Sequence, residues 1–298
     1  MNSKHLGKLL IPTLFAGVLI LNACKKDKDE PEQTVQEAAI RPVTAQSSAY
    51  VTQLFSYNPA PGQQINKAIG SNDGAKTVLN GKTGLVTLGA FGGNIVLGFD
   101  HTVLDQANKE DIIIYNNAFS GFAEPGVVWV MQDTNNNGKP DDTWYELAGS
   151  AQNQSGYQRN YAITYIRPAT ATADVAWTDN KGSSGVVKHN TFNTQAYYPE
   201  WITANTYTLT GTLLPATNIN DTNPSFVTSA SFAFGYADNL AGSDKIDIAN
   251  AIDEIGNKIT LKGIDFIKIQ TGIPYNLGGL GELSTEIKGI ADISIGGI

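Results

Sequence analysis

The residues best spaced to do chemistry are oxygen-bearing side chains between positions 133 and 142. In Asp-Thr-Asn-Asn-Asn-Gly-Lys-Pro-Asp-Asp they occupy relative positions 1, 3, 5, 9 and 10, with glycine at position 6. Calcium takes roughly six to eight oxygen ligands, and a glycine permits the sharp turn that gathers them. The segment therefore predicts a Ca²⁺ loop, although a plain polar turn would use the same Asn-Gly and Pro-Asp pairs. Its ligands would be Asp133, Asn135, Asn137, Asp141 and Asp142, with the backbone carbonyl of Lys139.

A second set of residues has the composition of a sugar-binding site. Aromatic rings stack on the C–H faces of sugars, and amide or carboxylate groups hydrogen-bond the hydroxyl groups. The competing interpretation is core packing, which would bury these rings and leave no ligand site. The candidates in loop-like stretches are Trp144, Tyr145, Trp177, Tyr197, Tyr198, Trp201 and Tyr236, together with Asp179, Asn180, Asp238 and Asn239.

Catalysis would need carboxyl groups at a defined separation. A glycoside hydrolase uses two of them, about 5–5.5 Å apart in retaining enzymes and about 6.5–9.5 Å apart in inverting ones. The sequence contains no Gly-x-Ser-x-Gly elbow, and it cannot place any two acidic residues across a cleft. We therefore expect a binding protein, with a glycoside hydrolase as the less favoured alternative. The available carboxyl groups are Glu124, Glu146, Glu200, Asp238, Glu282 and Glu286.

Strands must position these residues. From Ala49 onward, short apolar or alternating runs are separated by Gly, Asn, Asp and Pro, without convincing helical periodicity. Ile264–Gln270 carries isoleucines on both faces, so a second layer should cover it. We expect an all-β fold, a jelly-roll-like β-sandwich with long loops. The expected strands are Leu85–Leu88, Asn94–Phe99, Asp111–Tyr115, Gly126–Met131, Tyr161–Ile166, Tyr207–Leu213, Ser229–Phe234, Lys258–Leu261, Ile264–Gln270 and Glu286–Ile295.

The composition limits the domains and partners. The 298 residues are 41% hydrophobic and 16% charged, and 20 basic against 28 acidic residues give a formal charge of −8. Nucleic acid is excluded as a partner, because phosphate backbones are bound largely by Lys and Arg. Three His and one Cys disfavour a zinc centre. We expect one binding domain over residues 49–298, either a single sandwich or one with a subdomain inserted at residues 150–225.

The N-terminus has the features of a bacterial lipoprotein signal. Lys4 and Lys8 precede an apolar run of 13 residues, which is too short for a spanning helix of roughly 20. Ala23 directly before Cys24 resembles a lipobox. We expect a signal peptide over residues 1–23 and a lipid on Cys24, whereas an ordinary secretory signal with a stray cysteine is the alternative.

The segment after the cysteine is charged and polar. It begins Lys-Lys-Asp-Lys-Asp-Glu and shows no hydrophobic period up to about residue 48. Such a composition cannot bury enough surface to offset the entropy lost on ordering, so residues 24–48 should form a flexible tether. The stretch resembles the surface-export signal of Gram-negative lipoproteins, which favours an outer-membrane protein that faces the cell exterior. A periplasmic spacer is the alternative.

Several segments of the body form a series. Gly92–His101, Asp111–Phe119 and Glu124–Val130 contain a Gly-Gly-x-Ile-x-Leu-Gly-Phe strand and an Asn-Ala-Phe corner before a strand that opens with Glu. This order resembles a family of exported bacterial cell-surface proteins with a galactose-binding-like jelly roll. The likeness continues through Asp133–Leu147, Trp177–Asn180, Tyr197–Trp201, Gly235–Asn239 and Ile264–Lys268.

The resemblance implies a non-catalytic, surface-anchored lipoprotein associated with a TonB-dependent transporter and nutrient uptake. It also implies that loops at one end of the sandwich hold the ligand and that a structural calcium is frequent. It leaves the ligand open. A glycan is the leading expectation, a corrinoid of the vitamin B12 type is the second, and a structural or adhesive protein without a soluble ligand is the third.

Overall fold

The computed structural model describes residues 39–297, all of which lie within one compact unit. The expected signal peptide over residues 1–23 and the expected lipidation site Cys24 lie outside the described residues. In the part of the chain that is described, no helix is long and apolar enough to cross a membrane. This part consists almost entirely of strands and loops, which confirms the predicted all-β class.

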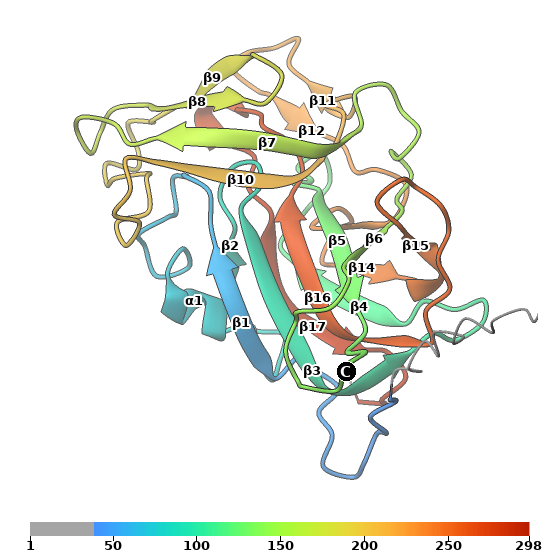
Figure 1. Ribbon diagram of the computed structural model, residues 1–298. Coiled ribbons are helices and arrows are strands. Elements are labelled where there is room, and N and C mark those ends of the chain that lie inside the picture. Colours follow the sequence, from blue (N-terminus) through green and yellow to red (C-terminus); the bar gives the residue numbers. More distant parts are fainter. Residues whose placement is uncertain (1–38, 298) are drawn as a thin grey trace, which may run out of the picture. The chain divides into compact units, whose positions relative to one another are not determined.

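Short strands follow one another along the described residues (Figure 1). The only α-helix among them is α1, and the two 3-10 helices are η1 and η2. In chain order the elements are β1 (Gln53–Asn58), α1 (Asn72–Lys76), β2 (Val86–Thr87), β3 (Asn94–Leu104), β4 (Ile112–Asn116), β5 (Gly126–Met131), β6 (Tyr145–Leu147), β7 (Gln158–Ile166), β8 (Val175–Asp179), β9 (Ser184–Val187), β10 (Thr206–Leu213), β11 (Ile219–Asn220), β12 (Thr228–Ser229), β13 (Tyr236–Ala237), β14 (Ser243–Ile246), η1 (Ile248–Asn250), β15 (Ala251–Ile252), β16 (Gly263–Thr271), η2 (Gly278–Leu280) and β17 (Glu286–Asp292).

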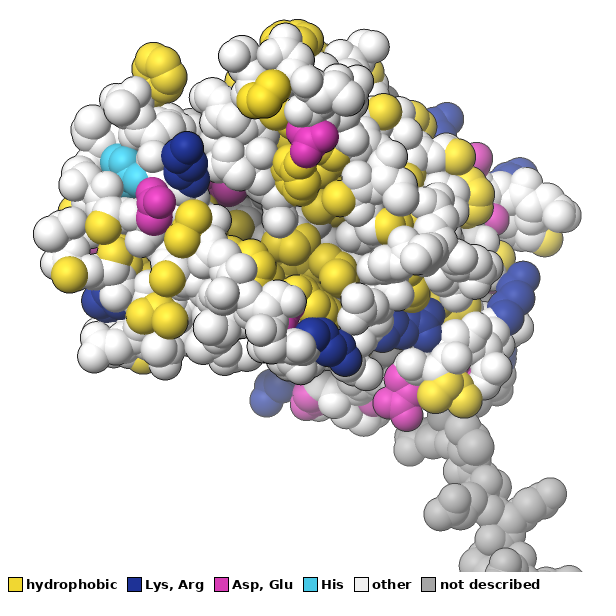
Figure 2. All heavy atoms as spheres, turned by 90° about the horizontal axis from the view of Figure 1, so that it is seen from above, with side chains coloured by type: hydrophobic (Ala, Val, Ile, Leu, Met, Phe, Trp, Pro, Cys, Tyr) yellow, Lys and Arg dark blue, Asp and Glu magenta, His cyan; other side chains and the backbone are white. Residues whose placement is uncertain are grey.

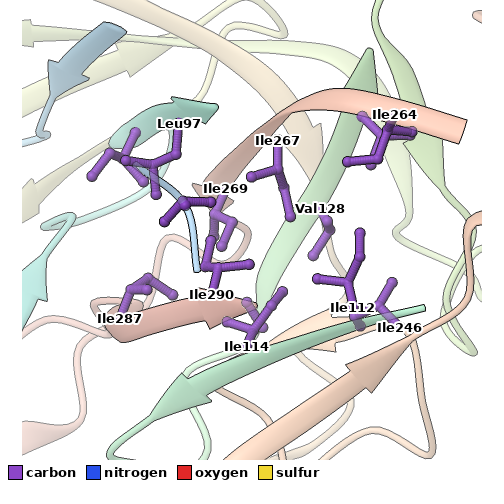
Figure 3. Packing of buried hydrophobic residues seen from close by; sticks show 14 of the residues in the cluster. Leu97, Ile112, Ile114, Val128, Ile246, Ile264, Ile267, Ile269, Ile287 and Ile290 are labelled. Atoms are coloured by element: carbon purple, nitrogen blue, oxygen red, sulfur yellow. The ribbon is translucent and has the colours of Figure 1, made fainter. Parts of the chain in front are cut away.

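Two antiparallel sheets face each other across the main core. The larger has the order β1-β3-β16-β5-β6-β15, with β13 paired to β5, and the smaller has the order β14-β4-β17-β2. This arrangement confirms the predicted β-sandwich. Figure 3 shows the side chains that meet between the sheets, among them Leu97, Val128, Ile267 and Ile269 from the larger sheet and Ile112, Ile114, Ile287 and Ile290 from the smaller.

Strand β16 lies at the centre of the larger sheet because both of its faces are apolar. It pairs with β3 and β5, so that Ile267 lies opposite Leu97 on one side and Val130 on the other. Ile267 and Ile269 are fully buried, so this face of the strand is covered as the sequence predicted. Each such side chain contributes roughly 1.5–3 kcal/mol of burial free energy. This strand therefore fixes the frame on which the loops are mounted.

A third antiparallel sheet, of order β10-β7-β8-β9, comes entirely from residues 158–213. This span lies inside the segment for which the sequence suggested an inserted subdomain. Figure 1 shows β7 and β10 crossing above the ends of β1, β3 and β16. The Tyr165 hydroxyl donates to the Phe91 carbonyl oxygen at 2.7 Å, and a Cβ on Gly92 would lie 2.7 Å from that of Leu209. The sheet is thus packed closely onto the sandwich.

Two of the expected strands are largely absent from the described residues. Of Ser229–Phe234, only the first residue belongs to a strand, because Asn239 takes over the backbone of Phe232. Its Oδ1 accepts from the Phe232 nitrogen at 2.6 Å and its Nδ2 donates to the Phe232 oxygen at 3.0 Å. Of Lys258–Leu261, only Lys258 forms a bridge, which joins it to Ile252. Local apolar patterns overpredicted pairing at both places.

The N-terminal end of the described chain is held by an ion pair. Arg41 falls inside the expected tether over residues 24–48, yet its guanidinium contacts the fully buried Asp265 of β16, with Nη2 and Nε at 2.8 and 3.0 Å from Oδ1. The Arg41 backbone also exchanges hydrogen bonds with Thr102 of β3. The segment is therefore held by an ion pair and hydrogen bonds, and not by a buried apolar face. Because its sequence shows no apolar periodicity, its composition predicted only a spacer.

His101 joins the two sheets of the sandwich. It is buried on β3, and its Nδ1 lies 2.7 Å from Asp100 and its Nε2 3.0 Å from Asp292 of β17. Burial opposes a charge on the imidazole, but the hydrogen bonds and charges of Asp292 and Asp100 outweigh it and raise the pKa of His101. The contact is therefore a cross-sheet clasp that favours the imidazolium.

Candidate functional site

The strongest candidate site is a cavity of about 170 Å³ that we call the carboxylate pocket. Three glutamates line it, and a group of apolar side chains borders them. Among the residues that the structure describes, no Lys, Arg or His lines this cavity. The lining residues are Gln63, Gln64, Asn117, Phe119, Phe122, Glu124, Leu277, Leu280, Glu282, Ser284 and Glu286.

The first wall of the pocket is the corner between β4 and β5. The Asn116 side chain ends β4 by accepting a hydrogen bond from the Ala118 nitrogen at 3.1 Å. The chain then turns back, with the Phe122 nitrogen donating to the Phe119 oxygen at 2.9 Å and Gly121 at a φ of +82°. Glycine adopts this left-handed conformation without steric cost. The turn leaves two phenylalanines at the mouth of the pocket.

The second wall is the connection from β16 to β17. Around η2 the chain folds back on itself, because the Leu277 nitrogen donates to the Gly281 oxygen at 2.7 Å and the Leu283 nitrogen to the Tyr275 oxygen at 2.8 Å. Glu282 lies on the returning arm of this turn, and β17 begins shortly afterwards. The pocket is therefore built where loops meet at the ends of central strands of both sheets.

Glu282 is the most enclosed acid of the pocket, with 4% of its surface exposed. Its Oε1 accepts from the Gln63 nitrogen at 2.9 Å, whereas its Oε2 is buried without a hydrogen-bond partner among the described residues. A Cβ on Gly62 would lie 2.3 Å from Oε1, so glycine is required for this close approach. Burial raises the pKa of Glu282 to about 8, and the charge of Glu286 adds to the shift. An empty pocket therefore favours a protonated Glu282 near neutral pH.

Glu124 and Glu286 are partly buried. Glu124 Oε1 accepts from the Ser284 nitrogen at 2.9 Å. The pKa of Glu124 is raised well above its usual range by burial and then by the charges of Glu286 and Asp238. Burial also raises the pKa of Glu286, although hydrogen bonds and the charge of Lys288 oppose the shift.

Asp238 supports the pocket from behind. It is fully buried, and its Oδ2 accepts from the Glu286 nitrogen at 2.7 Å while its Oδ1 accepts from the Ala118 nitrogen at 3.1 Å. One carboxylate thus ties β17 to the corner that carries the phenylalanines. Of the residues expected to bind a sugar, Asp238 is the one that the structure places beside this pocket, where its role is positioning.

The mouth of the pocket is aromatic and exposed. Phe119 and Phe226 have 61% and 62% of their surfaces exposed, and Phe122 lies between them with ring centroids at 4.7 and 5.7 Å. A second cavity of about 160 Å³ adjoins the first and shares Phe122, Leu277 and Leu280 with it. On the face shown in Figure 2, hydrophobic side chains also gather in a hollow. A solvent-exposed group of rings beside buried acids is typical of a ligand site.

The expected calcium loop closes on itself through one buried carboxylate. Asp133 is 2% exposed, and its two oxygens accept from the Asn137 and Gly138 nitrogens at 3.1 and 2.8 Å. Its own nitrogen donates to Asp265 at 2.8 Å. The loop is thereby attached to β16 through the same aspartate that holds the N-terminal arginine.

The other acids of the loop also have partners within it. Asp141 is exposed and accepts hydrogen bonds from the side-chain amides of Asn137 and Asn135, which lower its pKa. Asp142 accepts from the nitrogen and the hydroxyl of Thr134. These hydrogen bonds leave further lone pairs on the carboxylate oxygens, so they neither require nor exclude a cation. The calcium site at residues 133–142 stays a prediction.

A second acidic group, outside the expected calcium loop, brings three carboxylates together. Carboxylate oxygens of Asp105, Asp111 and Asp247 lie within 4.8 Å of one another, and among the described residues this is the one such group of three. Asp111 accepts from the Gln106 and Ile248 nitrogens at 2.9 and 3.0 Å, and burial raises its pKa to about 6. Because Asp247 is far in sequence from Asp105 and Asp111, local spacing could not have indicated the complete group.

The residues expected to bind a sugar do not converge on one surface. Tyr197, Tyr198 and Tyr236 are buried in hydrophobic clusters, as the core-packing interpretation expected, and Asn239 is buried on the backbone of Phe232. Trp201 is 40% exposed and lies beside Tyr57.

The remaining candidates lie on separate elements. Tyr145 packs against the main core and Trp177 against the core of the third sheet. Trp144 and Trp129 enclose the Lys268 ammonium, whose pKa burial lowers to about 8. Near β8, the Asp179 side chain accepts a hydrogen bond from the Ser183 nitrogen, and the Asn180 side chain accepts one from the Ala162 nitrogen. Both side chains therefore already have partners within the protein.

Some residues of the carboxylate pocket could be identified from the sequence. Three of the six carboxyl groups considered for catalysis line it together, namely Glu124, Glu282 and Glu286. The Asn-Ala-Phe corner, quoted above as a motif, supplies Asn117 and Phe119. Gln63, Gln64, Phe122 and the residues around η2 carried no local pattern that could have identified them.

Comparison with known proteins adds no family to this geometry. No protein-family model matches the chain, and no curated protein matches it. The function must therefore be argued from the site alone.

Proposed function

We propose that this protein is a non-catalytic, lipid-anchored binding protein of the outer membrane, facing the cell exterior, that captures a glycan in the carboxylate pocket for uptake. In this proposal Cys24 carries the lipid and a TonB-dependent transporter receives the ligand, as the sequence resemblance implies.

One observation carries the binding part of the proposal. Buried acids and exposed rings occur together in two adjoining cavities, with Glu282 and Phe119 lining the first and Phe226 lining the second. Carboxyl groups hydrogen-bond sugar hydroxyls, and rings stack on the apolar faces of the same sugar. The two adjoining cavities, about 170 and 160 Å³, offer room for a small ligand or for one end of a chain.

The test is ligand binding by the purified full chain. A panel of oligosaccharides and polysaccharides is screened by thermal shift, and hits are measured by calorimetry, because a ligand of the native state raises the melting temperature. The double substitution Phe119→Ala, Phe226→Ala should weaken a hit by about tenfold, since each stacked ring contributes about 0.5–1.5 kcal/mol.

The matched control is Phe234→Ala, because Phe234 is 51% exposed and lines neither of the two cavities. It should leave the affinity unchanged. A panel without any hit, or a hit whose affinity is insensitive to the double substitution, would contradict glycan capture in this pocket.

The anchoring part of the proposal is tested separately. Cells that express the chain with Cys24→Ser should lose metabolic incorporation of a labelled fatty acid and lose the protein from the membrane fraction. Unchanged labelling of this variant would refute lipidation at this residue, without bearing on the pocket.

A second candidate function is glycoside hydrolysis in the same pocket. It is favoured by the raised pKa of Glu282, about 8, in a cavity that holds two further carboxyl groups. A general acid of such enzymes needs a raised pKa of this kind. Release of reducing ends from a bound oligosaccharide, abolished in Glu282→Gln, would establish it. Recovery of the intact ligand after prolonged incubation would leave capture as the function.

A further inference from the structure

Two polar atoms of the carboxylate pocket have no partner among the described residues, and both are acceptors once Glu282 is ionised. Glu282 Oε2 is buried and unpartnered. Asn117 donates its Nδ2 to Glu286 Oε2, which leaves its buried Oδ1 without a donor. A buried acceptor without a partner costs free energy, so a ligand that fills the pocket should bring hydrogen-bond donors rather than acceptors.

The charge of the pocket points to a cation. Glu124, Glu282 and Glu286 line it, and Asp238 touches the Glu286 backbone from behind. The charge of Lys288 on β17 acts on Glu286, but Lys288 does not line the cavity. An anionic ligand would be repelled, whereas a cationic one would stabilise the ionised form of these acids, which burial otherwise disfavours.

The surroundings favour an organic cation over a metal ion. Among the described residues, carboxylate oxygens of the three pocket glutamates do not form a group of three within 4.8 Å, so the pocket lacks the clustered carboxylates that would favour a divalent ion. The mouth is formed by Phe119, Phe122 and Leu280, which suit an apolar surface, and aromatic faces also attract ammonium groups. The ligand should therefore combine a small positive donor with a ring that can stack.

We propose that the ligand unit held in the carboxylate pocket is a non-acetylated amino sugar whose ammonium group lies against Glu282 and the Asn117 oxygen. The inference rests on the proposed function, since it specifies which glycan the pocket takes. An ammonium offers three donors and one positive charge, which is what the unpartnered acceptors and the three acids lack.

The experiment compares three matched ligands with the full chain. They are β-1,4-linked tetramers of glucosamine, of N-acetylglucosamine and of glucose, which differ at the C2 substituent alone. At about pH 7, the glucosamine tetramer should bind at least about tenfold more tightly than the other two. Calorimetry in buffers of different ionisation enthalpy should also detect proton release with this ligand alone, because the ammonium ionises a protonated Glu282.

Variants then locate the preference. Glu282→Gln keeps the shape of the side chain and should reduce the preference for glucosamine to about threefold or less. Glu200→Gln is the control for net charge, since Glu200 is exposed and does not line the pocket. The comparison of ligands on the unmodified protein stands even if a variant does not fold.

The outcomes separate the two proposals. Binding of the glucose or N-acetylglucosamine tetramer as tightly as the glucosamine tetramer overturns the amino-sugar inference but leaves glycan capture intact. A preference for the glucosamine tetramer that persists in Glu282→Gln would mean that the ammonium binds elsewhere. This outcome also overturns the amino-sugar inference. Failure of all three tetramers, together with an empty glycan panel, overturns both.

Discussion

The carboxylate pocket and the Asp133–Asp142 loop are both rich in acidic residues, but they manage charge in opposite ways. In the loop, every acid accepts hydrogen bonds from nearby backbone or amide donors. In the pocket, Glu282 keeps one oxygen unpartnered, and burial raises the pKa of all three glutamates. The acids of the loop therefore all have hydrogen-bond partners, whereas Glu282 Oε2 in the pocket has none among the described residues.

The difference teaches that the state of a carboxylate matters more than its spacing in sequence. Contiguous Asp and Asn residues predicted a cation loop, yet such residues also supply their own turn with donors. The pocket draws its acids from the β4–β5 corner and from the segment that leads into β17. Unsatisfied burial, which local sequence does not encode, is what marks it as a site.

The largest expected effect comes from removing the central acid of the loop. Asp133→Ala removes the acceptor of the Gly138 nitrogen and one of the two acceptors of the Asn137 nitrogen, whose other acceptor is Asn135 Oδ1. A hydrogen bond to a charged group contributes about 1.5–3 kcal/mol. We expect the free energy of unfolding to fall by about 2–4 kcal/mol in a denaturant titration. A loss below about 0.5 kcal/mol would show that the loop is not held by this residue and would break the comparison.

Removing the buried acid of the pocket should instead increase the free energy of unfolding. Glu282 has a folded pKa of about 8, above its unfolded value, so its contribution to stability is present below the unfolded pKa and is lost as pH rises toward 8. Glu282→Gln removes that loss. We expect the variant to be more stable than the native protein by on the order of 2 kcal/mol at about pH 8, and nearly equal to it at about pH 4. Destabilisation at both pH values would show that Glu282 is a structural acid like those of the loop.

Calcium gives an intermediate effect that is confined to the loop. If calcium binds there, millimolar Ca²⁺ should raise the melting temperature by an amount equivalent to about 1–3 kcal/mol, and chelation should reverse it. Asp141→Asn should abolish the shift with little other change, because Asp141 is exposed. Asp247→Asn is the control, because Asp247 belongs to the other acidic group, with Asp105 and Asp111. A shift that follows this control instead would move the calcium to the second group.

The smallest effect is expected at the mouth of the pocket. Phe119 is 61% exposed, so Phe119→Ala should change the free energy of unfolding by less than about 0.5 kcal/mol. Denaturant titration of this variant beside the native protein measures the difference. A loss of more than about 2 kcal/mol would mean that the rings are core, which would remove the support for a ligand site.

The sequence predicted what local patterns encode. Alternation and apolar runs located the central strands, such as β4 and β16, because burial on one or both faces leaves a periodic trace. It overpredicted strands after Ser229, where Asn239 captures the backbone of Phe232.

The site was predicted only in its parts. Glu124, Glu282 and Glu286 were recognised as available acids, but their convergence depends on how β5, η2 and β17 are stacked. The proximity of Gln63 to Glu282 depends on a glycine whose missing side chain makes room for a carboxylate from the other end of the chain. Such long-range contacts leave no local pattern in the sequence.

The docking of Arg41 on Asp265 has a mechanical consequence. Along the described residues, Arg41 is where the N-terminal segment is tied to the body, so a pull through the proposed lipid anchor would load this contact. Asp265 lies on the central strand of the larger sheet and also holds Thr102 and the Asp133 nitrogen. Tension is therefore passed to the middle of the sheet instead of peeling the edge strand β1. The connection from β16 to β17 lies beyond this point of attachment, so a load-bearing anchor need not disturb the carboxylate pocket.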